Sequence, residues 1–449
     1  MRGEQQPQAP DPRRLLAVVV QWTGKEVRAL RVVLRMPLEG FARLIGAGRS
    51  TVTDLERGGA EIVPSWGVQH ALDEVLAQAS DEAKKRFEMR CEGKSNVWVS
   101  DSVGHNGNGG PTNRGDFFKA IGAVLAAGAV PPLEALERIA ADVGRSGRVD
   151  AGLVAAHEEW ADVLAGAHDA QRNDVLVLPV ADQADVLFGL LDRPIAPEDR
   201  RRLESITVAS HVQAGLLAFN AGDRTAARRY FATSWSVADD AGDDTLRART
   251  LGVAQVVHSP IVSGGRGGDV DRAVTLVRRA VHHARRADPV TRATVHHRLG
   301  LLLAASGDEC GFLAAYEAGD RIAVPYGQPD GHGYLARSFA QPPERATNKG
   351  IGLVRVGRAE EAVEALRPTL DPAAPGWTAI VLADIAMARV LQGDPEQACQ
   401  QLQRALTLAR RAGSAMGVER ILGVRDQFPE PWAALACVRE LDDRLRRPA

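Results

Sequence analysis

Apolar side chains recur every three to four residues along most of this chain, which is the spacing of one face of an α-helix. The pattern runs from about Leu15 to Arg90 and resumes at about Leu133, from which it continues almost unbroken. Ala, Leu, Val and Arg dominate the composition and only 5% of the residues are aromatic, which favours helices over strands. We therefore predict an all-α protein.

The helical pattern stops where Gly, Asn, Ser and Pro gather, and these interruptions predict the domain boundaries. At 449 residues the chain exceeds the roughly 250 to 300 residues that one hydrophobic core serves, so two or more domains are expected. The predicted parts are a disordered lead-in over 1–12, a first helical domain over 13–90, a flexible linker over 91–115 and a long helical region over 116–449.

The long helical region is divided by short corners in which a glycine is usually followed by an aspartate. A glycine suits such a corner because it tolerates positive φ, and each corner leads into a helical stretch that opens with small residues. Successive corner glycines are 46, 39, 50 and 36 positions apart, close to the repeat length of helical solenoids. The predicted corner glycines are Gly222, Gly268, Gly307, Gly357 and Gly393.

Two stretches of this region, residues 357–366 and 393–406, resemble the tetratricopeptide repeat (TPR). They share its glycine corner, the small residue behind the corner and the later Ala or Leu. The resemblance implies a TPR-like α-solenoid whose concave surface binds an effector, either a peptide, a protein or a small molecule, or which mediates dimerisation.

Residues 36–58, with the sequence MPLEGFARLIGAGRSTVTDLERG, have the pattern of two short helices that cross at a steep angle. Ala42 is small where the helices would touch, and Gly46 permits the sharp turn between them. On the second helix the polar residues recur at offsets of zero, one, four, five and eight positions, which places them on one outward face. The residues expected in the shared core are Phe41, Ile45, Val52 and Leu55.

This stretch resembles the Xre, or phage-repressor, helix-turn-helix family over its whole length, including the closing Leu-Glu-Arg-Gly signature at residues 55–58. The resemblance implies a lambda-repressor-like domain that places its second helix in the major groove of a double-stranded operator and works as a homodimer. The chain as a whole resembles actinobacterial Xre regulators that carry TPR-like C-terminal regions.

The resemblance also implies which residues of the second helix reach DNA. Arg49, Ser50 and Asp54 match positions that contact base edges, and Gly48 stands where the family often has a helix cap on a phosphate. Arg49 is the leading candidate because arginine binds guanine O6 and N7 bidentately. The predicted DNA-binding residues are Arg43, Gly48, Arg49, Ser50, Thr53, Asp54 and Arg57.

Two residues depart from the family pattern. Leu38 stands where the family frequently has a polar, phosphate-contacting residue. Asp54 presents a negative charge, which accepts a hydrogen bond from cytosine but otherwise repels phosphate. We therefore expect either a modest affinity or an unusual sequence preference.

Charge supports a nucleic-acid partner for this domain rather than for the whole chain. The formal net charge of the chain is −2. From Arg13 to Arg57, however, nine basic residues stand against four acidic ones, giving 9 − 4 = +5. A local positive excess is the electrostatic requirement for binding DNA phosphates.

Two structural contacts are expected around the first helix of this domain. Thr23 with Glu26 three residues later has the pattern of a capping box. By the family resemblance, Arg31 of the first helix pairs with Glu56 of the signature as a structural ion pair.

Other chemistry finds little support in the sequence. The four cysteines lie far apart, and the pairs His282-His283 and His296-His297 lack a carboxylate or cysteine pattern, so no metal and no cofactor is predicted. We find no nucleophile–base set and expect no enzyme. The chain shows neither a signal-peptide pattern nor ~18 consecutive apolar residues, so a cytoplasmic protein without membrane contact is expected.

The sequence thus predicts a sequence-specific DNA-binding transcriptional regulator whose helical region senses an effector or assembles a dimer. The alternative is a TPR-like protein-interaction scaffold whose degenerate helix-turn-helix does not read DNA.

Overall fold

The computed structural model is all-helical, and it separates into two compact units, residues 1–109 and 110–449. The only β-pairing among the described residues is an isolated bridge between Val149 and Ile195. The all-α prediction is therefore confirmed for this part of the chain. The structure describes residues 22–45, 47–59, 64, 68, 72, 75–76, 79–80, 83, 86–87, 90, 133–142, 147–168, 172–261, 268–322, 331–339 and 342–447.

The predicted lead-in over 1–12 and linker over 91–115 lie outside the described residues. The division between the two units, after residue 109, falls inside the predicted linker.

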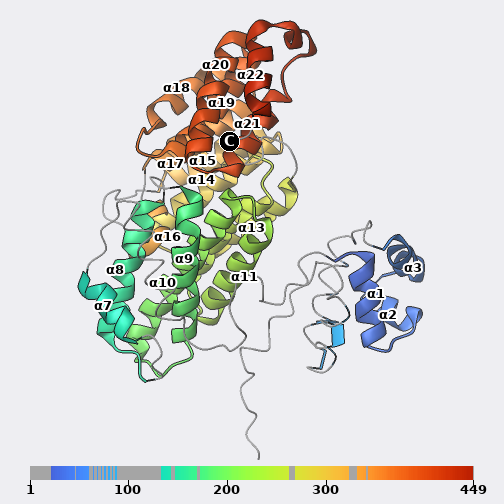
Figure 1. Cartoon of the computed structure of the whole chain (residues 1–449), viewed down its shortest axis with the longest axis vertical. Helices are drawn as coiled ribbons and strands as arrows, with labels where there is room; N and C mark the ends of the chain where they lie inside the picture. Colours follow the sequence, from blue (N-terminus) through green and yellow to red (C-terminus); the bar gives the residue numbers. More distant parts are fainter. Residues whose placement is uncertain are drawn as a thin grey trace, which may run out of the picture. The chain divides into compact units, whose positions relative to one another are not determined.

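The described part of the first unit includes the short helices α1 (Gly24–Val33), α2 (Leu38–Leu44) and α3 (Arg49–Gly58) (Figure 1). The predicted capping box begins α1: Glu26 Oε2 accepts from the Thr23 backbone N–H at 2.9 Å, and the Thr23 side chain caps the first turn. The expected core residues Phe41, Ile45, Val52 and Leu55 are all buried, as is Ala42 between the helices. Gly46, the predicted turn residue, lies outside the described residues.

Trp22 and Phe87 complete the core of the first unit from outside these helices. Their rings lie 5.8 Å apart, and both side chains are fully buried. The three helices therefore share a core with the segment that follows them.

The second unit is a succession of helices in which neighbours along the chain pack against each other (Figure 1). Its elements are α7 (Leu133–Asp142), α8 (Ala151–Ala167), α9 (Asn173–Leu190), α10 (Pro197–Asn220), α11 (Arg224–Asp240), α12 (Asp244–Ala254), η2 (Gln255–Val257), α13 (Val270–Ala284), α14 (Pro289–Ala305), α15 (Glu309–Asp320), α16 (Gly333–Phe339), α17 (Pro342–Arg355), α18 (Ala359–Leu366), η3 (Arg367–Thr369), α19 (Pro375–Leu391), α20 (Pro395–Arg411), α21 (Ala415–Arg425), η4 (Glu430–Ala434) and α22 (Ala436–Arg446).

From α10 onward most of these helices form hairpins, and we call residues 197–446 the hairpin array. The exception is α16, which packs mainly against α8 and α10. All five predicted corner glycines adopt positive φ, from +74° at Gly393 to +109° at Gly268. In four of the five corners the next residue, an aspartate, caps the following helix through its side chain, whereas Arg358 makes no such cap. Gly242 and Gly413 form further corners of the same kind that the sequence analysis did not identify.

A repeated close contact sets the distance between the two helices of a hairpin. In three hairpins a glycine lies against the large side chain that follows it by 16 positions, and a methyl group on the glycine would come within 3.0 Å of that side chain. The pairs are Gly215 with Phe231, Gly300 with Tyr316, and Gly350 with Leu366. The glycine is required because it lets the backbone approach the partner's ring or branched chain.

In the third hairpin Phe312 occupies a position where the other hairpins have a small residue. The equivalent positions, five residues after the corner glycine, are the buried alanines Ala227, Ala273, Ala362 and Ala398. The ring of Phe312 lies against Gly352 of α17, where an added Cβ would be 2.5 Å from Phe312 Cε2. The next hairpin accommodates the larger ring because residue 352 has no side chain.

The array also makes a contact between positions far apart in sequence. Arg224, at the start of α11, donates to both carboxylate oxygens of Glu419 in α21 at 2.9 and 2.7 Å. A Cβ on the corner residue Gly222 would lie 3.5 Å from Cβ of Ala415. α21 therefore lies against the corner of the first hairpin.

Two histidines of the second unit are fully buried. His157 Nδ1 lies 3.1 Å from Gln183 Oε1, and His211 Nδ1 donates to the Thr207 carbonyl at 2.9 Å. Burial disfavours the charged imidazole and lowers the pKa of each histidine to about 4. Both side chains are therefore neutral in the folded protein near neutral pH.

Among the described residues no helix is both long and apolar enough to cross a bilayer.

We expect Gly352→Ala to lower the free energy of unfolding by about 1–3 kcal/mol, because the new methyl group overlaps the Phe312 ring. Urea denaturation followed by circular dichroism measures this change. Gly189→Ala is the matched control: Gly189 is helical and exposed with no atom near its added Cβ, so its stability should rise by roughly 0.5–1 kcal/mol. Equal effects of the two substitutions would contradict the packing argument.

We also expect stability to fall as the pH drops from about 6.5 towards 4. Over this range the unfolded histidines, with a pKa near 6.5, bind protons that buried His157 and His211 reject. Each of these two histidines accounts for up to about 2 kcal/mol of the loss in the free energy of unfolding at pH 5. Denaturation at pH 7 and pH 5 should show a smaller loss for the His157→Asn, His211→Asn double variant than for wild type. The exposed control His282→Asn should behave as wild type.

Candidate nucleic-acid interface

The helix α3 has one buried and one outward face. Val52 and Leu55 are buried in the core of the first unit. The structure leaves Gly48, Arg49, Ser50, Asp54 and Arg57 exposed and Thr53 half-buried. The hydrophilic stripe predicted from the sequence therefore faces solvent within its own unit.

The first turn of α3 begins without a side-chain cap. Gly48 is the N-cap residue with φ −72° and ψ 148°, and no side chain of the described residues accepts from the first N–H groups of the helix. The first turn carries no acidic residue either. These N–H groups and the positive end of the helix dipole are therefore available to an anion.

Two exposed ion pairs engage the charged residues of this stripe. Arg49 Nη1 lies 2.8 Å from Oε1 of Glu39 in α2, and Arg57 Nη1 lies 3.4 Å from Asp54 Oδ1. Arg43, on the exposed side of α2, donates a long 3.5 Å bond to the Glu39 carbonyl. The sequence analysis missed Glu39, because nothing in the residue spacing indicates a contact between two helices.

The predicted pair of Arg31 and Glu56 is present and fixes α3 against α1. Arg31 Nε donates to Glu56 Oε1 at 2.5 Å and Nη2 donates to Oε2 at 2.8 Å, while Nη1 donates to the Met36 carbonyl at 3.1 Å. The two side chains are only 17% and 12% exposed. The hydrogen bonds to Glu56 raise the pKa of Arg31 above its ordinary value. This bidentate geometry holds α3 at one rotation.

Leu38 is half-buried and packs at the edge of the core of the first unit. It is the first residue of α2, and the N-cap residue Pro37 makes no side-chain hydrogen bond. Packing thus accounts for an apolar residue at this position.

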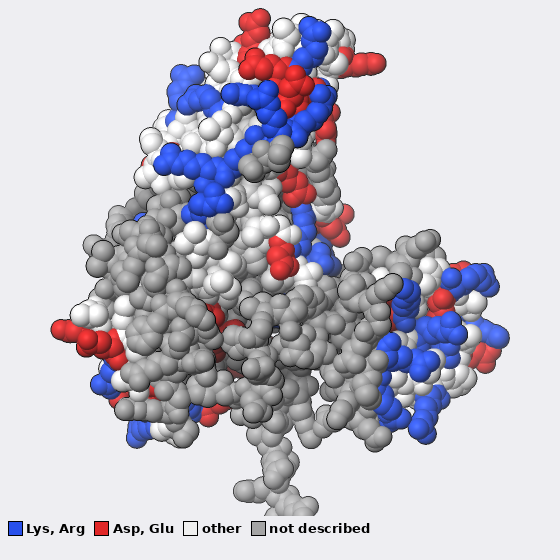
Figure 2. Space-filling view, in the orientation of Figure 1, with Lys and Arg blue, Asp and Glu red and all other residues white. Residues whose placement is uncertain are grey.

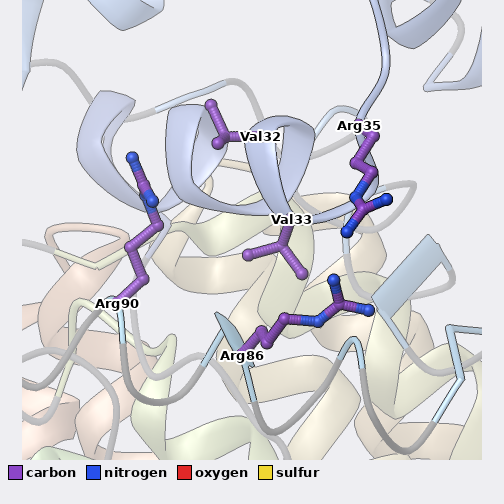
Figure 3. A pocket seen from close by; sticks show the side chains of 5 residues that line it. All are labelled: Val32, Val33, Arg35, Arg86 and Arg90. Carbon is purple, nitrogen blue, oxygen red and sulfur yellow. The ribbon is translucent and has the colours of Figure 1, made fainter.

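A second basic feature lies where the end of α1 meets the segment around residue 86. Three arginines and two valines line an open hollow of about 490 Å³. Figure 3 shows Val33 pointing into it between Arg35 and Arg86, with Arg90 at its other end. The sequence analysis did not identify this hollow, since it is lined by two segments that are 51 positions apart at their nearest residues, Arg35 and Arg86.

Positive charge predominates over the described residues of the first unit. Nine basic residues stand against four acidic ones, giving 9 − 4 = +5. Figure 2 shows Lys and Arg side chains gathered over this unit with few Asp or Glu among them. Residues 1–109 as a whole carry 15 basic and 14 acidic residues, giving 15 − 14 = +1, so the positive excess is local to the described surface around α1–α3. A local excess of this kind attracts polyanions.

The histidine pairs singled out in the sequence are engaged in other contacts. His283 Nδ1 lies 3.0 Å from Asp244 Oδ1, and His297 Nε2 lies 2.9 Å from Asp320 Oδ1. Within the part of the chain that the structure describes, no group of three or more His, Cys, Asp or Glu side chains could hold a metal ion.

Comparison with known proteins gives little beyond this geometry. No family model matches the sequence, and no curated protein matches it. Solved structures similar to the chain include a signal transduction ATPase with numerous domains (STAND) that has a tetratricopeptide repeat sensor, from Pyrococcus horikoshii. The two are 11% identical with a TM-score of 0.35, over 94% of this chain and 63% of that chain. The chain thus spans less than two thirds of that protein, and a likeness this distant carries no functional assignment.

We expect Glu56→Ala to loosen α3, because it leaves the half-buried Arg31 guanidinium without its carboxylate partner and with only the Met36 carbonyl as an acceptor. The expected decrease in the free energy of unfolding is roughly 1.5–3 kcal/mol. Hydrogen exchange measured by mass spectrometry should then be faster for the amides of α3. Glu39→Ala removes an exposed partner instead and should change exchange little, since such pairs contribute at most about 1 kcal/mol. Equal exchange in both variants would show that the Arg31–Glu56 pair does not hold the helix.

Proposed function

We propose that this protein is a transcriptional regulator that reads double-stranded DNA with α3. The observation that carries the proposal is the exposed stripe of α3, held in one orientation by Arg31 and Glu56. The resemblance of residues 36–58 to the Xre helix-turn-helix family supports the same interpretation.

Arg49 is the proposed base-reading residue. In the free protein it pairs with Glu39 at 2.8 Å, with both side chains largely exposed. An exposed pair of this kind contributes about 0.2–1 kcal/mol, whereas a bidentate contact to guanine contributes about 1–3 kcal/mol of discrimination. The exchange of Glu39 for guanine is therefore favourable. Ser50 and Asp54 are the neighbouring base-edge candidates.

Backbone contacts would fix the position of the helix on the duplex. The uncapped N–H groups after Gly48 suit a phosphate. Arg43 in the last turn of α2 and Arg57 in the last turn of α3 are exposed and carry further positive charge. Such contacts supply affinity but no sequence preference. Two copies of the chain, each on one half-site about one helical turn apart, would form the homodimer expected of this class.

The hairpin array is proposed to bind an effector or to assemble the dimer. Its stacked hairpins agree with the TPR-like resemblance of residues 357–366 and 393–406. Helical repeats of this kind present extended surfaces for ligands.

A scaffold that does not read DNA is the second candidate, and one observation favours it. Arg49 and Arg57, the two arginines of the stripe, are both paired with carboxylates of the same unit. In a scaffold these pairs would persist, and the array alone would bind partners.

A gel-shift assay on duplexes selected from a random library tests the proposal. We expect Arg49→Ala to weaken binding roughly 10- to 100-fold. Glu39→Gln should bind as well as wild type or more tightly, because it frees Arg49 and removes a negative charge near the phosphates. Affinity should fall steeply with salt.

The control is Arg404→Ala, which removes an exposed arginine from α20 in the array and should leave the gel shift unchanged. A failure to retard any duplex at low salt would reject DNA reading, as would equal binding by Arg49→Ala and wild type. Either result would favour the scaffold.

A further inference from the structure

The short helix α16 lies outside the order of the hairpins. α14 packs directly against α17, and α17 forms the next hairpin with α18, so the stack of hairpins is continuous without α16. α16 packs instead against α8 and α10, which lie much earlier in the chain (Figure 1). Between α15 and α17 the chain therefore returns to the first helices of the second unit and places these seven residues there.

Apolar side chains dock α16 onto these helices. Leu335, Ala336 and Phe339 are buried, and Leu335 and Phe339 lie about one helical turn apart on the same face. Gly333, which adopts φ +73°, begins α16 so close to α10 that an added Cβ would lie 3.3 Å from Cβ of Ala209. Glycine thus allows the start of α16 to approach α10.

Two arginines of different hairpins hold the aromatic ring at the end of α16. The guanidinium carbons of Arg249 in α12 and Arg298 in α14 lie 5.6 and 4.5 Å from the centroid of the Phe339 ring. Both arginines are buried, and Arg249 is fixed by its bond to Thr291 Oγ1 at 2.8 Å and its pair with Asp288 at 3.0 Å. A guanidinium over a ring face is attracted by the ring's quadrupole, so this position favours an aromatic side chain over an aliphatic one.

Carboxylates of α8 hold the other end of α16. Asp162 Oδ1 accepts from the Gly333 backbone N–H at 2.6 Å, and Asp162 Oδ2 lies 2.7 Å from His332 Nδ1. His332 Nε2 lies 3.8 Å from Oε2 of Glu158. The side chains of Asp162 and His332 are 49% and 44% exposed. Water therefore competes for these charged contacts, and each contributes little to stability.

The docking of α16 is more finely balanced than the packing of the hairpins. A helix of seven residues is not stable in water by itself, so α16 depends on the surface that it covers. The burial of its few apolar side chains has to offset the conformational entropy that is lost when the segment is ordered. The hairpins, in contrast, pack against one another without its help.

We propose that the surface under α16 is a peptide-binding site, and that α16 is its built-in occupant, which an effector peptide replaces. We call this surface the α16 site. Its residues contact α16 from α8, α10, α12 and α14, and they are Asp162, Ala209, Arg249, Gly252 and Arg298.

The contacts of α16 define the chemistry of the effector. It carries an aromatic side chain for the two guanidinium groups and, four positions earlier, a branched apolar side chain in the place of Leu335. A backbone N–H or a positively charged group two or three positions before that side chain meets Asp162. A short peptide with this pattern makes the same contacts as α16 and competes with it directly.

The inference rests on the effector-binding part of the proposed function and deepens it by naming the class of effector. It does not depend on DNA reading by α3. A chain that shifts DNA but binds no peptide would refute this inference alone. A chain that binds peptide but shifts no DNA would refute DNA reading alone.

Fluorescence polarisation of a synthetic peptide of residues 331–339, labelled at its C-terminal end, tests the site on the full-length chain. We expect the double variant Leu335→Ser, Phe339→Ser to bind this peptide at least about tenfold more tightly than wild type, because only chains with an uncovered site can bind it. Phe339→Ala within the peptide should weaken its binding to the double variant roughly tenfold or more. The matched control is Leu313→Ser, Leu391→Ser, which replaces two exposed leucines outside the α16 site and should bind as wild type.

Hydrogen exchange shows whether α16 is released by itself. In the double variant the amides of α16 should exchange faster, while those of α19 and α20 keep their wild-type rates. Gly333→Val keeps both buried side chains but strains the start of α16, because of its positive φ and its contact with Ala209. It should also uncover the site, and it decides the question if the double variant fails to fold. Equal peptide binding by wild type and these variants would overturn the inference, as would faster exchange throughout the array whenever α16 is released.

Discussion

The contact between Arg31 and Glu56 determines which residues of the first unit can meet a partner. It joins α1 to α3 through two parallel hydrogen bonds, and the rotation of α3 follows from it. Val52 and Leu55 then lie in the core, and the hydrophilic side of the helix lies outside. The DNA-reading hypothesis depends on this single half-buried contact more than on any individual charge at the surface.

Local requirements explain what the sequence could predict. A corner with positive φ needs glycine at one position and a helix cap at the next, so Gly222, Gly307 and Gly393 were recognisable without any knowledge of packing. The amphipathic pattern of α3 likewise shows in a window of ten residues. Such features depend on neighbours along the chain.

Contacts between distant segments explain what the sequence could not predict. Glu39 approaches Arg49 only because α2 and α3 cross, and Arg420 reaches Asp384 only because α21 packs against α19. Gly352 has no local role in its helix, and its reason appears only with the ring of Phe312 from the preceding hairpin. These residues carry no pattern of their own, since the spacing that matters is in space.

The contact of α21 with the first corner of the array changes how the array should unfold. A stack of repeats in which each unit touches only its neighbours loses structure from its ends, one unit after another. Here Arg224 and Glu419 connect positions 195 residues apart, so the start of the stack cannot separate without disturbing its other end. Local unfolding at one end of the array should therefore destabilise the other end. The array should then unfold as one cooperative unit rather than repeat by repeat.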